Sequence, residues 1–166
     1  MKTDTIRDAL VAAVAANAAL ATWCDLHFDR DVTVFDGIDR MQLPDQGDAA
    51  NSSAGDYPFV ALDVTEKMQG RSTDEEALSV SVFCALLDDS PYEDGDIDNV
   101  KKLPGIAKRE AFRTLVLAAV IGASIDNGYV QTVESVNLPV EYFPEFAVDM
   151  TVTIARPYAF RENRFE

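Results

Sequence analysis

Two segments of the chain carry apolar residues at helical spacing. Residues 5–22 are rich in alanine and place Ile6, Leu10 and Val14 on one side of a helix. Residues 106–128 repeat the pattern over a longer stretch and end at an Asn-Gly pair, which is a common way for a helix to stop. We therefore predict one helix near the start of the chain and one in its second half.

The other apolar segments are rich in β-branched and aromatic residues and alternate with polar ones, as strands do. In the last of them Phe146, Val148 and Met150 alternate with small or polar residues. Predicted strands cover residues 26–35, 57–67, 76–89, 129–142 and 146–157. Because only a short polar interruption at 70–74 separates the second strand from the third, these two should form an antiparallel hairpin.

The resulting order, α-β-β-β-α-β-β, predicts the fold class and the domain organisation. It favours a single α+β domain over residues 1–166, a two-layer sandwich in which two helices cover one face of a mostly antiparallel sheet of about five strands. Residues 36–56 are dominated by Asp, Gly, Ser and Asn, so we expect a long mobile loop there. Residues 156–166 follow the last strand as a terminal tail.

The charge balance limits the partners of the chain. Twenty-nine acidic and fourteen basic residues give a formal net charge of −15, so most of the surface should repel phosphate backbones and anionic lipid. Specific nucleic-acid binding and membrane binding are therefore disfavoured. The opening residues resemble a signal peptide, but Asp4, Asp8 and Asn17 interrupt the required charge and apolar pattern, so we expect a helix of the mature, cytoplasmically made protein.

The acidic stretch DGDIDN, residues 94–99, places three carboxylates at alternate positions, as the start of a helix-loop-helix calcium site does. Such a site also needs glycine at loop position six and glutamate at position twelve. Here those positions hold Asn99 and Gly105. The stretch is better interpreted as a solvated acidic connection, and we expect no metal and no cofactor.

The sequence contains few of the arrangements that enzymes use. Cys24 and His27 could form an activated pair, but their spacing at the end of a helix favours a partly buried thiol and a surface imidazole. No Gly-x-Ser-x-Gly or phosphate-binding glycine motif occurs, so we predict no catalytic residues and no enzyme activity. One alternative of a different class stays open: a small α+β enzyme or ligand-binding protein with carboxylates from Asp63, Asp88 or Glu134 in a cleft.

The last eleven residues, RPYAFRENRFE, interleave arginine and aromatic residues in an otherwise acidic protein. These residue types are enriched at protein interfaces because they offer large contact areas. A frayed terminus is the alternative, but exposed aromatic side chains favour a binding partner.

The order of elements along most of the chain resembles that of the tail-terminator (tail-completion, minor tail) proteins of tailed bacteriophages. It runs from an alanine-rich helix, a strand and a long polar loop to the phrase YPFVALDV at residues 57–64, then to a long hairpin, a helix and a closing strand with a tail. The resemblance implies a virion structural protein of the tail and neck, assembled in the bacterial host cytoplasm. It implies a homo-oligomer, a hexameric ring, that caps the tail tube, stops its polymerisation and takes part in head-tail joining through the neck connector. A neck or head-completion connector protein is the alternative. The length of residues 36–56 and the acidic connection depart from the family pattern.

The resemblance leads us to propose two sets of functional residues, one at an interface and one in a lumen. We expect contacts with neighbouring subunits, the tail tube protein or neck proteins at the hairpin tip and in the tail: Met68, Arg71, Arg156, Tyr158, Phe160, Arg161, Arg164 and Phe165. We expect an acidic lumen, through which DNA passes without being specifically bound, at Asp45, Asp48, Asp56, Asp94, Asp96 and Asp98.

Overall fold

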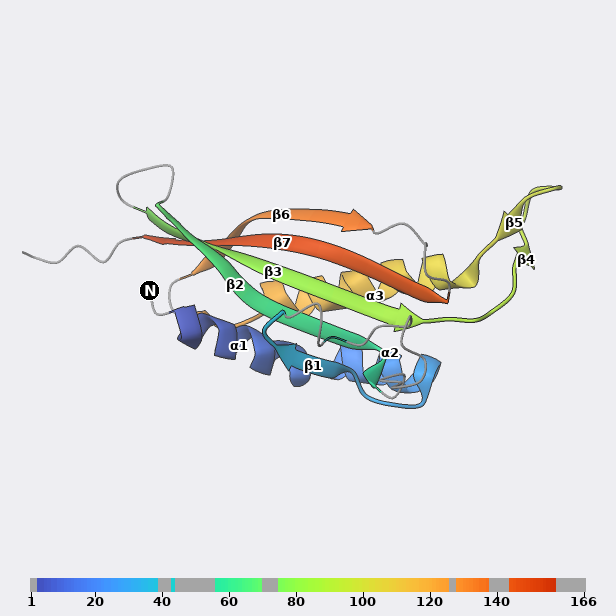
Figure 1. Cartoon of the computed structure of the whole chain (residues 1–166), viewed down its shortest axis with the longest axis horizontal. Coiled ribbons are helices and arrows are strands. Elements are labelled where there is room, and N and C mark those ends of the chain that lie inside the picture. Colours follow the sequence, from blue (N-terminus) through green and yellow to red (C-terminus); the bar gives the residue numbers. More distant parts are fainter. Residues whose placement is uncertain are drawn as a thin grey trace, which may run out of the picture.

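The computed structural model describes residues 3–38, 43, 56–69, 75–125, 128–137 and 144–157 (Figure 1). The elements are α1 (Thr3–Ala15), α2 (Ala18–Phe28), β1 (Thr33–Asp36), β2 (Phe59–Gln69), β3 (Glu75–Leu87), β4 (Glu93–Asp94), β5 (Lys101–Lys102), α3 (Pro104–Ile121), β6 (Tyr129–Asn137) and β7 (Glu145–Pro157).

Five of the strands form one sheet in the order β1-β2-β3-β7-β6, and β4 and β5 form a separate small hairpin. Only β1 and β2 run parallel; every other pair in the large sheet is antiparallel. The predicted α+β fold with a mostly antiparallel sheet of about five strands is therefore confirmed, as is the hairpin of β2 and β3. The described part of the chain has three helices, however, where the sequence pattern predicts two.

The main core lies between the helices and one face of the sheet. Alternate residues of β3, from Leu78 to Leu86, and of β7, from Phe146 to Ile154, point into it. The helices contribute Leu10 from α1 and Phe112 from α3. A smaller apolar cluster on the opposite face contains Tyr57, Phe59, Phe83 and Leu43.

The single first helix predicted over residues 5–22 is wrong, because Asn17 divides it into two. The Asn17 backbone is extended, and its Oδ1 accepts a hydrogen bond from the Leu20 backbone N–H at 2.9 Å, so Asn17 caps a new helix. The axes of the two helices differ by 51°. α2 then runs on to Phe28 and ends at Asp29, a residue with left-handed backbone, so the predicted strand over 26–35 is reduced to four residues.

Other predicted boundaries also shift. α3 starts at Pro104, which fits the first helical turn because proline has no N–H to leave unpaired there, and it ends before Gly122. β6 is described from Tyr129 to Asn137, and the remaining residues of that predicted strand, 138–142, lie outside the described residues. Of the predicted loop 36–56 only residues 36–38, 43 and 56 are described, so its predicted mobility falls outside the described residues.

In the described part of the chain, no single helix has the length and apolar composition needed to cross a membrane. The pair α1 and α2, from Thr5 to Phe28, meets both criteria only when its two bent halves are taken together.

Candidate interaction surfaces

The acidic connection contains a small hairpin that projects from the sheet beyond the end of β3 (Figure 1). We call residues 92–102 the acidic arm. Glu93 pairs with Lys102 and Asp94 with Lys101 in its ladder. The Gly95 N–H donates to the Val100 carbonyl at 2.8 Å, which closes the arm into a compact turn.

Residues 94–99, which resemble the start of a calcium loop, form this turn. Asn99 has a φ of 66°, a left-handed conformation that asparagine tolerates better than most residues. The carboxylates of Asp94 and Asp96 form ion pairs with Lys101 and Lys102. Within the described ranges, no three His, Cys, Asp or Glu side chains are grouped so that they could hold a metal ion.

The arm also exposes apolar side chains, which the sequence analysis did not single out. Tyr92 is 65% exposed, Ile97 70% and Val100 41%. Their signal in the sequence is three large apolar residues in an otherwise polar stretch. Because such side chains gain free energy when they leave water, the arm is a candidate contact surface as well as an acidic one.

Asp88 fixes the base of the arm. Its side chain is almost fully buried, accepts hydrogen bonds from the backbone N–H and the hydroxyl of Ser90, and lies 3.0 Å from Lys108 Nζ of α3. Its backbone N–H donates to the Pro144 carbonyl just before β7. Burial alone would raise the pKa of Asp88, but the hydrogen bonds from Ser90 and Lys108 outweigh it and lower the pKa. Asp88 is thus a buried anion that ties the arm to α3 and β7.

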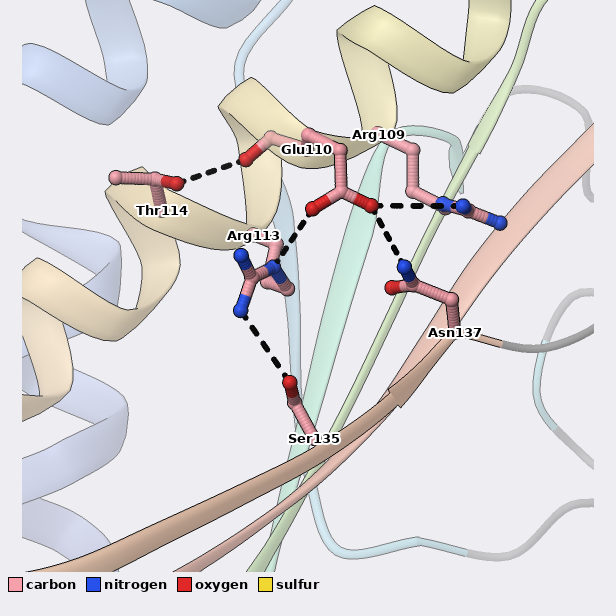
Figure 2. A network of polar contacts seen from close by, with 6 residues as sticks. All are labelled: Arg109, Glu110, Arg113, Thr114, Ser135 and Asn137. Carbon is pink, nitrogen blue, oxygen red and sulfur yellow. Dashed lines mark hydrogen bonds and ion pairs between the residues drawn. The ribbon is translucent and has the colours of Figure 1, made fainter.

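A second polar cluster joins α3 to the edge strand β6 (Figure 2). Glu110 lies at its centre: Oε1 accepts from Asn137 Nδ2 at 2.8 Å and Oε2 accepts from Arg113 Nε at 3.1 Å. Arg113 also donates to the Ser135 hydroxyl at 3.3 Å, and Arg109 lies 3.4 Å from Glu110 Oε1. These contacts hold the far half of β6 to the helix by polar groups rather than by a packed apolar core.

Among the described residues, β6 is an edge strand of the sheet, with β7 as its one neighbour. Every residue in it except Val130 is exposed, including Val133 and Val136. An edge strand presents unpaired backbone N–H and C=O groups, so it can bind another extended segment. β6 is therefore a further candidate contact surface that the sequence analysis did not identify.

The hairpin tip and the C-terminal tail, which carry the predicted contacts, leave the sheet at the same end. Glu75 of β3 pairs with Pro157 of β7, and Met68 of β2 pairs with Ala77, next to Glu76, which pairs with Arg156. The backbones that lead into the hairpin tip and the C-terminal tail are therefore neighbours. The remaining members of the predicted interface, Arg71, Tyr158, Phe160, Arg161, Arg164 and Phe165, lie outside the described residues.

The described members of the predicted lumen lie at the other end of the sheet. Asp56 precedes β2, whose first residue Phe59 pairs with Ala85 near the end of β3, and the acidic arm follows that same end. Asp45 and Asp48 lie outside the described residues. The sheet thus separates the described parts of the two predicted sets, and their roles remain predictions.

The phrase that carries the family resemblance forms the entry to β2. The Tyr57–Pro58 peptide bond is cis, the Pro58 carbonyl accepts from the Thr33 N–H at 3.0 Å, and the Tyr57 carbonyl accepts from Arg30 Nη1 at 3.4 Å. The Tyr57 and Phe59 rings meet edge to face at 5.1 Å. This phrase has a packing role at the junction of β1 and β2.

The carboxylates named for a cleft do not converge. Asp63 and Glu134 lie in one row across the sheet, with Ser81 and Thr151 between them, which separates their strands by about 14 Å. Asp88 is seven positions beyond Ser81 along the chain, roughly 23 Å at strand spacing. No shared acid-base or metal chemistry can be built from these three side chains in this conformation.

Cys24 and His27 also lie in different environments, one buried and one exposed. Cys24 is fully buried in the core, and this burial, followed by the charge of Asp31, raises the pKa of its thiol to about 12. His27 is exposed, with its ring 4.6 Å from the Trp23 ring. A thiol with this pKa is protonated at neutral pH and is a poor nucleophile.

Comparison of the chain with protein-family models and with curated proteins gives no match.

Proposed function

We propose that this chain is a structural virion protein, a ring-forming tail terminator that caps the tail tube, stops its polymerisation and joins the tail to the neck. A two-layer α+β subunit with helices on one face and no catalytic role is part of the proposal. The observation that supports it most directly is that the acidic arm and the strand ends that lead into the predicted hairpin-tip and tail contacts lie at opposite ends of one long sheet.

The length of the sheet separates these surfaces. β3 and β7 pair over thirteen residues each, from Glu75 opposite Pro157 to Leu87 opposite Glu145. Twelve steps along a strand span about 40 Å. A subunit that uses unlike surfaces at opposite ends makes heterologous contacts, which build a ring when the rotation closes. Such a ring ends a growing tube when the face that it turns away from the tube offers no equivalent surface for the next ring of tube protein.

The charge of the chain suits a channel for DNA. With a net charge of −15, a ring of such subunits presents a wall that repels phosphate, so DNA passes without being held. The acidic side chains at the arm end, Asp56 and Asp98 among them, are the proposed lumen residues. The proposed partners are further copies of this chain, the tail tube protein and the neck connector, in the virion.

Oligomeric state and tube capping test the proposal together. Native mass spectrometry and negative-stain images of one sample should show a closed ring of about six subunits with a central hole. Added to polymerising tail tube protein, the ring should bind tube ends and stop elongation. A strict monomer that leaves tube growth unchanged overturns the proposal. Binding to the neck connector without any effect on the tube supports the neck-protein alternative instead.

A further inference from the structure

We infer that the acidic arm of one copy binds the C-terminal segment, residues 156–166, of a neighbouring copy. This deepens the proposed function by naming the contact between ring subunits, and it rests on that function.

The arm requires a partner for physical reasons. Its ladder has only two residues per strand, and an isolated two-stranded hairpin is marginally stable in water. Tyr92, Ile97 and Val100 remain exposed on it, with Ile97 at the turn. The ion pair of Asp88 with Lys108 anchors the base of the arm to α3.

The charge of the arm indicates the chemistry of the partner. Lys101 and Lys102 are already paired with Asp94 and Asp96. Glu93 and Asp98, both exposed, form no ion pair within the part of the chain that the structure describes, so the arm presents net negative charge next to apolar side chains. The matching partner is an extended segment that carries both guanidinium and aromatic groups.

The chain contains such a segment at its own C-terminus. Its last eleven residues hold three arginines, Arg156, Arg161 and Arg164, interleaved with Tyr158, Phe160 and Phe165. Many cations elsewhere have partners of their own: Arg7 lies 2.6 Å from Asp36, Lys108 pairs with Asp88, and Arg113 pairs with Glu110. With three arginines against Glu162 and Glu166, the segment is weakly basic in an otherwise acidic chain, and it carries the guanidinium and aromatic groups that the arm can bind.

The length of the C-terminal segment shows that this contact must join two copies of the chain. The segment leaves β7 at Pro157, whereas the arm follows Leu87 at the opposite end of β3, about 40 Å away along the strands. The nine residues after Pro157 span at most about 30 Å when fully extended. They cannot reach the arm of their own chain, so a second copy must supply the segment. The contact is heterologous, which is the kind that closes rings.

A cysteine cross-link tests this contact directly. In an Ile97→Cys/Phe165→Cys variant, mild oxidation should produce covalent multimers up to the size of the ring, while each single variant should not. The buried Cys24 and Cys84 leave a low background. Leu26, which is 77% exposed on α2, provides the matched control: Leu26→Cys/Phe165→Cys should yield no multimer ladder.

A charge swap provides a second, independent measurement. Glu93→Arg/Asp98→Arg and Arg161→Glu/Arg164→Glu should each weaken assembly on the order of tenfold, and their combination should restore most of it. Rings that form normally but give no more cross-linking than the Leu26 control overturn the inference and leave the proposed function standing. A wild-type protein that is monomeric, together with an Ile97→Cys/Phe165→Cys variant that does not cross-link, overturns both.

Discussion

Replacement of Gly105 by alanine should destabilise the fold through a single close contact. Gly105 lies in the first turn of α3 and is buried against Phe146 of β7. A Cβ atom there would lie 2.2 Å from Phe146 Cε2, 2.4 Å from Cζ and 2.7 Å from Cδ2. Carbon atoms in contact normally stay about 3.5 Å apart, so the ring or the helix must move by more than about 1 Å.

The size of the effect follows from two opposing contributions. Phe146 is only 1% exposed, so its ring has no free space to enter, and overpacking of this kind costs about 1–3 kcal/mol. Alanine gains up to about 1 kcal/mol over glycine from helix propensity, and less in a first turn. We therefore expect a net loss of about 1–2 kcal/mol in the free energy of unfolding. For a domain of this size the thermal midpoint should fall by roughly 2–8 °C.

Urea unfolding monitored by Trp23 fluorescence measures this loss. Trp23 is the only tryptophan, and its ring stacks on Phe112 of α3 at 5.7 Å, so the signal reports on the same helix. Gly122→Ala, at the other end of α3, is the matched comparison: a Cβ atom there would lie 3.1 Å from the Ala118 carbonyl oxygen, a milder contact, so its loss of stability should be smaller than that of Gly105→Ala. Phe146→Leu should relieve part of the clash, so the double variant should lose less than the sum of the two single losses. A Gly105→Ala protein as stable as the wild type would refute the reasoning.

Three other results are expected. Glu110→Ala removes the carboxylate that accepts the hydrogen bonds joining β6 to α3. A loss of about 1–2 kcal/mol should accelerate amide hydrogen exchange in β6 about fivefold to thirtyfold. The control Thr114→Ala removes only the hydrogen bond from its hydroxyl to the Glu110 carbonyl and should have little effect. Because the pKa of Asp88 is lowered in the folded state, its charge stabilises the protein above pH 4, and this contribution is lost as the pH falls through the folded pKa. Asp88→Asn removes the titrating group. The thermal midpoint of this variant should therefore depend less on pH between about 5 and 3 than that of the wild type. Burial raises the pKa of Cys24 and Cys84 to about 12, which leaves roughly one thiol in ten thousand ionised at pH 8, so iodoacetamide should label both only after denaturation; rapid labelling of the native protein would contradict this.

The sequence pattern predicted the elements whose signal is local and periodic. β3 and β7 alternate over thirteen residues, and both were placed within two residues of their ends. The first helix was misjudged because its apolar spacing continues through Asn17. A side-chain cap at that position competes with an uninterrupted helix, and the spacing alone does not show which wins.

The candidate surfaces were less predictable because they depend on pairing between distant residues. The tail and the hairpin tip became neighbours only through the register of β3 with β7, which joins Glu75 to Pro157. In the acidic stretch the sequence pattern emphasises the carboxylates. The arm is defined instead by Gly95, Asn99 and the lysines Lys101 and Lys102 that follow. The exposure of Ile97 depends on how the turn of the arm is placed relative to the sheet and helices, and no local sequence pattern contains this information.

The distribution of charge shows how an acidic chain could assemble with itself. Copies with a net charge of −15 repel each other, but at physiological ionic strength this repulsion is screened beyond about 8 Å. An ion pair within a contact acts over a few ångströms and is screened much less. If the fourteen cations were spread evenly, no contact would gain enough local attraction. Concentrating three arginines among aromatic residues at the chain end, opposite an arm that exposes both acid and apolar groups, would give cohesion at the contact. The surface outside the contact, including Asp56 of the proposed lumen, would then stay acidic.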